Sequence, residues 1–223
     1  GEVVGFAGLV GSGRSETMEA LFGVSPREKG KLRINGTEIE IHNPKDAIRH
    51  KIAFATEDRK RSGLNLIGSI KENVTMVSLA EKVSKHGIIQ EKKEGEVTEQ
   101  YIKKLRIKTP NGDELVGNLS GGNQQKVVLA KWLLGEPEII IFDEPTRGID
   151  VGAKHEIYEL INALSEQKKA IIVISSEMPE LMGICDRLYV MSEGYITGEL
   201  NKDEFNQEAI MRLASARKGG MTQ

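Results

Sequence analysis

The chain has 223 residues, which suits one domain carrying an inserted lobe or two small domains that share a sheet. Hydrophobic residues make up 39% and charged residues 29%, as in an ordinary soluble globular protein. The formal net charge of -2 argues against an extended nucleic-acid-binding face, because a polyanion is bound by clustered positive charge. The single cysteine, Cys185, excludes an intramolecular disulfide and a cysteine-based zinc site.

The N-terminal residues predict a strand, a loop and a helix, followed by a hairpin. Glu2 to Ala7 is a short apolar run that ends in glycines, and a helix-like segment, Ser15 to Phe22, follows it. Lys31 to Ile34 and Thr37 to Ile41 flank Asn35-Gly36, a turn typical of hairpins because both positions need φ > 0. We therefore expect an antiparallel β flap after the first helix.

The middle of the chain passes from short helix and strand signals to a long charged, helix-favouring stretch. Asn43-Pro44 is typical of a helix start, and Ile52 to Ala55 predicts a further strand. From Arg59 to about Gly117 the residues are charged and helix-favouring, and Glu91 to Leu105 is rich in Glu and Lys at i,i+4 spacing. We expect a helical lobe here, inserted between parts of an α/β core.

The C-terminal part predicts a parallel sheet. Two β-rich runs, Glu138 to Phe142 and Ala170 to Ser175, flank a helical stretch from Gly152 to Gln167. Apolar strands joined by a helix indicate a parallel sheet that is covered on both faces. A last hairpin is expected from Arg187 to Leu200, and the polar tail from Arg217 is expected to be disordered.

The loop after the first strand has the frame of a phosphate-binding loop. It reads GLVGSGRS, against GxxxxGK(S/T), so arginine replaces lysine. Glycines let backbone N–H groups curl around phosphate oxygens at the start of a helix. Arginine keeps the charge but is longer and forked, so nucleotide binding is expected and phosphoryl transfer is in doubt. The expected nucleotide contacts are Gly8, Gly11, Ser12, Gly13, Arg14 and Ser15, with Ser15 also on Mg²⁺.

A second motif ends an apolar strand in two carboxylates, in the run IIIFDE from Ile139 to Glu144. Asp143 would lie at the carboxyl edge of the sheet, where open α/β sheets bind ligands, and would hold Mg²⁺. Glu144 would polarise the attacking water as a general base. For each of these motifs the alternative is a turn without a ligand, and the presence of both in one chain favours the functional interpretation.

A third motif, LSGGNQQ from Leu119 to Gln125, precedes an apolar helix, Val127 to Leu134. Here the chain resembles the ABC ATPase family, whose signature is LSGG(N/Q)Q and whose motifs follow in this order. In that family the signature meets the γ-phosphate of ATP held by the opposite subunit. A Ser-Gly-Gly helix start without a ligand is the alternative. The expected contacts are Ser120, Gly121, Gly122, Asn123 and Gln124.

The resemblance implies an α/β fold of the P-loop NTPase, ABC ATPase type. That fold has a RecA-like parallel-sheet core, an antiparallel β flap and an inserted helical subdomain. The chain is then expected to be one nucleotide-binding domain, with its core in residues 1–58 and 118–223 and its helical subdomain in about 59–117. The resemblance further implies ATP and Mg²⁺ as cofactors.

Three positions depart from the family pattern. Glu57 stands where a glutamine usually senses Mg²⁺, and Ser176 stands where the family has its switch histidine. Arg14 replaces the phosphate-loop lysine, whereas Asp150 aligns with the aspartate that communicates across the dimer. We expect Glu57 still to contact Mg²⁺ or its waters, and Ser176 to sense the γ-phosphate weakly. The departures together indicate a degenerate nucleotide site.

The segments GLVGSGRS, TEDRKRSGL, LSGGNQQKV, DEPTRGID and SSEMPE resemble the C-terminal half of the fused ATPase subunits of monosaccharide importers, such as those for ribose, galactose or xylose. This implies an N-terminal nucleotide-binding half on the same polypeptide and transmembrane permease subunits as partners. A periplasmic sugar-binding protein would act indirectly. The expected location is the cytoplasmic face of the inner or plasma membrane.

Two other classes of function stay open at this point. One is a nucleotide-responsive regulatory module that docks through the helical lobe without catalysis. The other is a soluble P-loop enzyme such as a kinase, in which the LSGGN signature has no role. On the transport hypothesis, the isolated chain is expected to show weak or no ATPase activity, and the sugar is chosen by other subunits.

Overall fold

The computed structural model describes residues 1–27 and 29–216, so the tail expected from Arg217 lies outside the described residues. The chain forms two compact units, which are described here one by one. The first consists of Gly1–Phe54, Glu138–Glu144 and the residues from Tyr158 onward. The second consists of Ala55–Pro137 and Pro145–Ile157.

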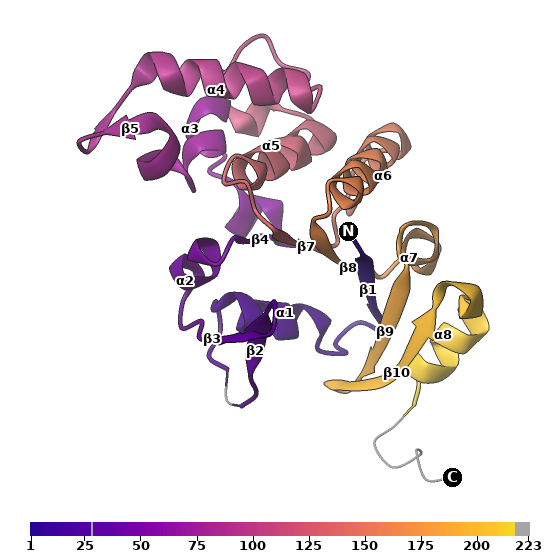
Figure 1. The fold of residues 1–223 in the computed structure, drawn as a ribbon. Helices are drawn as coiled ribbons and strands as arrows, with labels where there is room; N and C mark the ends of the chain where they lie inside the picture. Colours follow the sequence, from indigo (N-terminus) through magenta and orange to yellow (C-terminus); the bar gives the residue numbers. More distant parts are fainter. Residues whose placement is uncertain (28, 217–223) are drawn as a thin grey trace. The chain divides into compact units, whose positions relative to one another are not determined.

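The first unit is built on a six-stranded sheet in the order β10-β9-β1-β8-β7-β4 (Figure 1). β1 pairs in parallel with both β8 and β9, β7 pairs in parallel with β8, and β10 returns antiparallel to β9. The strands span Val3–Gly8 (β1), Ile52–Ala55 (β4), Ile139–Asp143 (β7), Ala170–Ile174 (β8), Arg187–Ser192 (β9) and Tyr195–Asn201 (β10). The expected P-loop α/β class, with its mixed sheet, is confirmed.

Burial explains why these segments are strands. Ile140, Ile141, Val173 and Ile174 are all at most 2% exposed, and neighbouring residues of a strand point to opposite faces, so β7 and β8 are covered on both faces. Continuous runs of β-branched residues are typical of such buried parallel strands. The carboxyl ends of these strands therefore form one edge of a rigid sheet, and the loops that follow them are held in place.

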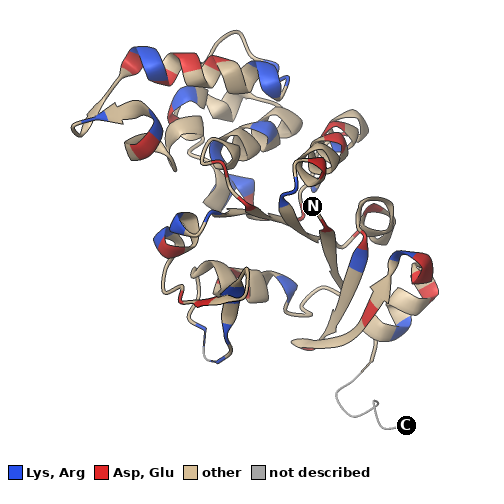
Figure 2. Ribbon diagram, viewed as in Figure 1, with Lys and Arg blue, Asp and Glu red and all other residues tan. Residues whose placement is uncertain are grey.

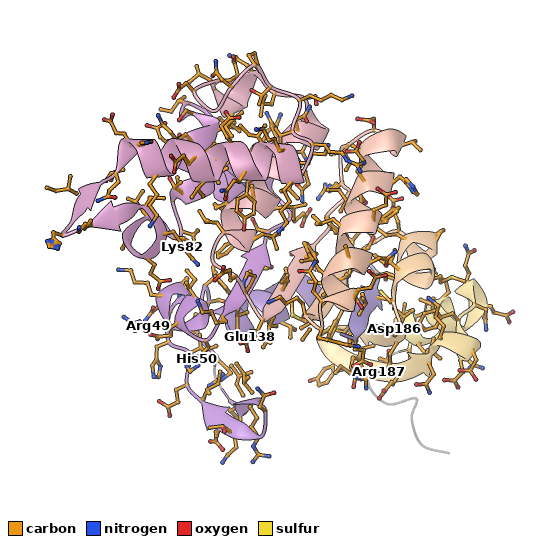
Figure 3. All side chains as sticks on the ribbon, turned by 45° about the horizontal axis from the view of Figure 1, so that its top comes forward. Arg49, His50, Lys82, Glu138, Asp186 and Arg187 are labelled. Atoms are coloured by element: carbon orange, nitrogen blue, oxygen red, sulfur yellow. The ribbon has the colours of Figure 1, made fainter. Side chains whose placement is uncertain are left out.

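The opposite edge of the sheet is held by charged side chains at the start of β9, seen in Figure 3. Asp186 accepts a hydrogen bond from the backbone N–H of Val3 at 2.8 Å. Arg187 pairs with Glu2 at 3.0 Å and with Glu199 at 2.7 Å. These contacts connect the ends of three neighbouring strands of the sheet.

Two short helices of the first unit begin with an asparagine side-chain cap. Helix α2 (Pro44–Arg49) follows Asn43, whose side chain accepts from the N–H groups of Lys45 and Asp46. The predicted flap is present, with Asn35 and Gly36 both at positive φ in its turn. The remaining elements of the first unit are α1 (Arg14–Phe22), β2 (Leu32–Ile34), β3 (Thr37–Ile39), α7 (Met178–Ile184) and α8 (Gln207–Ala214). Helix α6 (Val151–Glu166) begins in the second unit and ends in the first.

The second unit is mainly helical. Its helices are α3 (Ile70–Thr75), α4 (Glu91–Lys104) and α5 (Gly121–Leu133), with single π-helical turns at Arg59–Gly63 and Leu79–Val83. A small hairpin, β5 (Ser84–Lys85) and β6 (Ile88–Ile89), interrupts them, which the sequence did not predict. Figure 2 shows basic and acidic residues interspersed along α4, as the i,i+4 pattern predicted. Among the described residues, no helix is long and apolar enough to cross a membrane.

Candidate nucleotide-binding site

The loop between β1 and α1 turns twice through left-handed backbone. Gly11 has φ 79° and Gly13 has φ 91°, conformations that cost little only for glycine. Gly13 is the N-cap of α1 and supplies no side-chain cap, so the first N–H groups of the helix stay available for a ligand. A Cβ atom at Gly8 would lie 2.5 Å from the carbonyl oxygen of Met191, which explains the glycine there. The loop has the form that phosphate binding requires.

Two buried oxygen atoms in this unit lack a hydrogen-bond partner among the described residues. They are Ser12 Oγ in the loop and Asp143 Oδ1 at the end of β7. An unsatisfied buried polar group costs about 1–3 kcal/mol, so native structures keep few of them. A phosphate oxygen would accept from the Ser12 hydroxyl, and a cation would satisfy Asp143. Both residues therefore fit a magnesium nucleotide.

Asp143 lies next to Ser15, the residue expected on the metal. Burial raises the pKa of Asp143 to about 6, while the hydrogen bond from Ser15 opposes that rise. A carboxylate beside a hydroxyl is a suitable oxygen pair for Mg²⁺, which usually takes only one or two protein ligands besides phosphates and water. Accordingly, the described residues contain no cluster of three or more His, Cys, Asp or Glu side chains around one point.

Glu144 follows directly, in the left-handed region at φ 49°. Ser176 Oγ donates to its Oε2 atom at 3.1 Å, and the Arg14 guanidinium lies 4.0 Å from its Oε1 atom. Burial raises the pKa of Glu144, and the Ser176 hydrogen bond and the Arg14 charge partly offset that effect. A raised pKa suits a general base, but both carboxylate oxygens already have partners in the protein.

Arg14 does not extend away from the sheet. Its Nη1 atom donates to the carbonyl oxygen of Ser175 at 2.7 Å, in a buried hydrogen bond across 161 residues of sequence. Its side chain is only 8% exposed. One branch of the guanidinium fork is thus bonded to the end of β8 and another faces Glu144. The charge that would reach the terminal phosphates is held at the sheet edge by the protein's own acceptors.

The signature lies in the second unit, at the start of α5. Ser120 is the N-cap residue, exposed and without a side-chain cap bond of its own. Asn123 Nδ2 donates to Ser120 Oγ at 2.9 Å, which holds the hydroxyl in place. Cβ atoms added to Gly121 and Gly122 would lie 2.8 Å from Arg59 Nη2 and 2.6 Å from Ala153 Cβ. Close packing therefore explains both glycines.

Gln124 differs from its neighbours in the signature. It is 5% exposed, and its Nε2 atom donates to the carbonyl oxygen of Val116 at 3.2 Å. This contact fixes α5 against the turn at Val116–Asn118. Its expected contact with nucleotide stays a prediction.

Glu57 belongs to the second unit, where its carboxylate forms an ion pair with Arg147. Arg59 reinforces this connection by donating to the carbonyl oxygens of Arg147 at 2.8 Å and Gly148 at 3.3 Å. Asp150 accepts from the backbone N–H of Ala153 at 3.0 Å at the start of α6. Glu57, which replaces the expected glutamine, thus has a basic partner inside the run DEPTRGID, and its metal role stays a prediction.

The structure brings together Arg14, Ser15, Asp143, Glu144 and Ser176 within the first unit. Glu57 and the signature belong to the second. Sequence reasoning missed the Ser175 carbonyl group as the partner of Arg14, because every residue has a carbonyl and no pattern marks one. It also missed Arg147 as the partner of Glu57, although the opposite charges of these two side chains were a usable signal.

Known proteins resemble this chain over most of its length. Residues 1–147 match the family model described as ABC transporter. The ribose import ATP-binding protein RbsA of Clostridium perfringens strain 13 is 54% identical over 214 residues, which cover 96% of this chain and 43% of the relative. A putative ribose/galactose/methyl galactoside import ATP-binding protein of Halalkalibacterium halodurans is 52% identical over 217 residues, covering 97% of this chain and 41% of that protein. The chain therefore spans less than half the length of these relatives.

Solved structures give the same fold. The ATP-binding cassette MJ1267 of an ABC transporter superposes with a TM-score of 0.79 at 21% identity, covering 96% of this chain and 88% of the other. The dimeric, post-hydrolysis cassette MJ0796 bound to ADP and Pi has a TM-score of 0.77 at 20% identity, with 92% and 87% covered. The family model and this shared fold lead to one conclusion: the chain belongs to the ABC transporter family.

Proposed function

We propose that this chain is the second nucleotide-binding half of a sugar-import ATPase and couples ATP binding and hydrolysis to monosaccharide uptake. The curated relatives are named as ribose or galactose import proteins, and this chain corresponds to less than half of each. As one nucleotide-binding domain it would have its core in residues 1–58 and 118–223 and its helical subdomain in about 59–117. Its partners would be an N-terminal nucleotide-binding half, permease subunits and, indirectly, a periplasmic sugar-binding protein. It would lie at the cytoplasmic face of the membrane.

The nucleotide site formed by this chain's own phosphate loop is proposed to bind nucleotide with little turnover. The observation that carries this is the position of Arg14, which donates to the Ser175 carbonyl group instead of presenting its charge to a γ-phosphate. Ser176 is bonded to Glu144 and lacks the reach of a histidine ring. Without charge at the γ-phosphate, the developing charge of phosphoryl transfer is poorly stabilised.

The remaining groups of the site would each keep a defined role. The loop N–H groups and Ser12 would bind phosphate oxygens, and Ser15 and Asp143 would hold Mg²⁺. Bound there, Mg²⁺ would neutralise phosphate charge. Glu144 would orient a water molecule, but its two oxygens are shared with Ser176 and Arg14. The site therefore supports binding better than hydrolysis.

The signature is proposed to complete the competent site on the facing half. Ser120 is exposed, its hydroxyl is held by Asn123, and it stands at the start of α5, a 13-residue helix. A helix start attracts anions through its free N–H groups and its dipole. The two halves would then have different roles: this chain would supply the signature, and the facing half would supply the phosphate loop of the competent catalytic site.

The isolated chain is expected to show negligible ATPase activity, at least about 100-fold below that of the full-length protein, in line with the loss of one key charge contact. Phosphate release from purified chain and full-length protein, at equal concentration and with Mg²⁺, measures this. Turnover by the isolated chain equal to that of the full-length protein would overturn the proposal that its nucleotide site is degenerate. A full-length protein that binds ATP without hydrolysing it would favour the regulatory-module alternative.

Arg14→Lys is expected to raise the affinity of the isolated chain for ATP by about tenfold in the presence of Mg²⁺ and its affinity for ADP, which keeps only the β-phosphate, by a smaller factor. Lysine is a compact point charge that can reach terminal phosphates, and a new charge-assisted hydrogen bond has roughly this strength. Calorimetric titration with both nucleotides tests it. Arg33→Lys in the exposed flap is the matched control. Equal ATP affinities of wild type and Arg14→Lys would contradict the assigned role of Arg14.

A further inference from the structure

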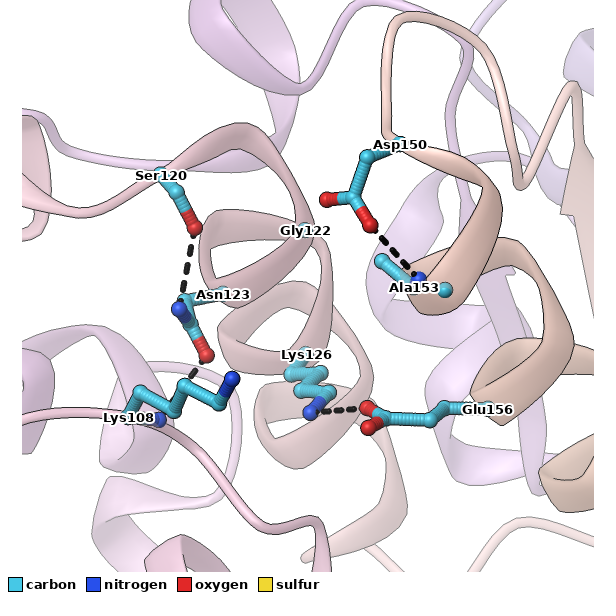
Figure 4. Close-up of a pocket in the computed structure, with 9 residues that line it drawn as sticks. Lys108, Ser120, Gly122, Asn123, Lys126, Asp150, Ala153 and Glu156 are labelled. Carbon is cyan, nitrogen blue, oxygen red and sulfur yellow. Dashed lines mark hydrogen bonds and ion pairs between the residues drawn. The ribbon is translucent and has the colours of Figure 1, made fainter.

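An open pocket of about 190 Å³ lies beside the signature within the second unit. The start of α5 forms one wall with Ser120, Gly122 and Asn123, and the start of α6 forms another. Lys108, in the segment between α4 and α5, completes the lining. Figure 4 shows the Lys108 side chain reaching past Asn123 toward the interior of the pocket.

Three of the four charged groups around this pocket have partners. Lys126 forms an ion pair with Glu156 and donates to the carbonyl oxygen of Arg106 at 2.9 Å. The carboxylate of Asp150 accepts from Ala153. The ammonium group of Lys108, in contrast, has no hydrogen bond or ion pair within the part of the chain that the structure describes. The two lysines and two carboxylates that line the pocket balance in charge, and Lys108 is the cation among these described residues whose ammonium group is left available to a ligand.

The side chain of Asn123 forms hydrogen bonds with both Lys108 and the signature residue Ser120. Its Oδ1 atom accepts from the backbone N–H of Lys108 at 2.8 Å, while its Nδ2 atom donates to Ser120 Oγ at 2.9 Å. One amide side chain thus sets the position of both the signature hydroxyl and the lysine backbone. A group bound by the hydroxyl would be within reach of the flexible lysine side chain.

We propose that Lys108 is a further phosphate-binding residue of the signature half-site and contacts the terminal phosphate of the ATP held by the facing half. This inference rests on the proposed function, in which the signature serves that ATP. The signature itself offers a hydroxyl and backbone N–H groups, which are neutral. Lys108 adds a full positive charge, and charge-assisted hydrogen bonds to phosphate are about twice as strong as neutral ones.

Lys108 also interacts electrostatically with Asp150, which lines the same pocket. The pKa of Asp150 is lowered, chiefly by the hydrogen bond from Ala153, and the Lys108 charge contributes in the same direction. The charge of Lys108 thus acts across the pocket toward α6. Because Lys108 is exposed and its side chain bonds to no described residue, its removal is not expected to disturb the fold.

The test compares three variants of the full-length ATPase: Lys108→Ala, Lys108→Arg and, as matched control, Lys103→Ala on the exposed face of α4. Lys108→Ala is expected to raise the KM for MgATP by about tenfold, the effect of losing one charged contact. Lys108→Arg should retain most of the affinity, and Lys103→Ala should match wild type. Inhibition by ADP, which lacks the terminal phosphate, should be the same in all of them. Thermal melts verify folding.

An unchanged KM in Lys108→Ala would overturn the inference, as would equal losses in Lys108→Ala and Lys103→Ala or in Lys108→Ala and Lys108→Arg. A parallel weakening of ADP inhibition would also overturn it, because the contact would then not be to the terminal phosphate. The Ser120→Arg variant distinguishes a failure of the Lys108 role from a failure of the proposed half-site. If it inactivates the protein while Lys108→Ala does not, only the role of Lys108 fails. If neither variant has an effect, the proposed half-site fails.

Discussion

Replacing Ser120 with arginine in the full-length protein is expected to abolish ATP hydrolysis, with a loss of at least about 100-fold in kcat, the usual effect of removing one preorganised donor. Ser120 is exposed at the start of α5, and its hydroxyl is held at 2.9 Å by Asn123. The arginine side chain would fill the space that a γ-phosphate needs and would displace the hydroxyl. Steady-state ATPase assays on full-length wild type and variant measure the effect.

The fold should survive this change, because Ser120 makes no side-chain cap bond and its side chain faces solvent. Gln100→Arg on α4 is the matched control, since it introduces the same side chain at another exposed position of the second unit. That control should keep wild-type activity. Wild-type hydrolysis in Ser120→Arg, with a wild-type melting temperature, would rule out a role of the signature in the facing site.

Lys131→Met is expected to raise the free energy of unfolding at pH 7 by about 1–3 kcal/mol, because one charged group is no longer buried. Lys131 on α5 is 5% exposed; its ammonium group donates to the carbonyl oxygen of Gly63 and lies 5.2 Å from the ring centre of Trp132. Burial lowers its pKa from 10.5 to about 8. Methionine has nearly the same shape and carries no charge. Urea denaturation of wild type and variant at several pH values measures the difference.

The sign of the pH dependence follows from the lowered pKa of Lys131 in the folded state. Below pH 8 the lysine is charged in both states, and the full cost of burial is present. Between about pH 8 and 10.5 the folded protein loses this proton before the unfolded chain does, so wild type gains stability relative to Lys131→Met. The difference in unfolding free energy between Lys131→Met and wild type should therefore shrink over this pH range. For Lys92→Met, at an exposed position of α4, the difference from wild type should not change with pH in this way. A difference between Lys131→Met and wild type that is constant across this range would contradict the assignment.

Much of the fold was predictable because its signals are local. The strand Ile52–Ala55 and the flap turn at Asn35-Gly36 lie where the sequence placed them. The loop glycines Gly11 and Gly13 adopt the left-handed backbone that their motif requires. Such features depend on residue type at fixed spacing, so they can be recognised without knowing what packs against them.

Two helices were not predicted from the sequence, α7 and α8. They have seven and eight residues, and helices this short are marginal without tertiary packing. In the structure Leu181 of α7 and Ile210 of α8 are both 0% exposed. Their stability comes from burying one or two apolar side chains against the rest of the first unit, which a periodicity count over such a short segment does not detect.

By itself, the sequence determined the class of this protein and the chemistry of its motifs: a phosphate loop with an arginine, an acidic strand end and a signature. Only the tertiary structure decided which partners those groups have. It bonds Arg14 to a carbonyl group 161 residues away, joins Glu57 to Arg147 and makes Asn123 the common partner of Ser120 and Lys108. A hydrogen bond depends on atomic separations of about 3 Å, and these arise from packing rather than from sequence spacing.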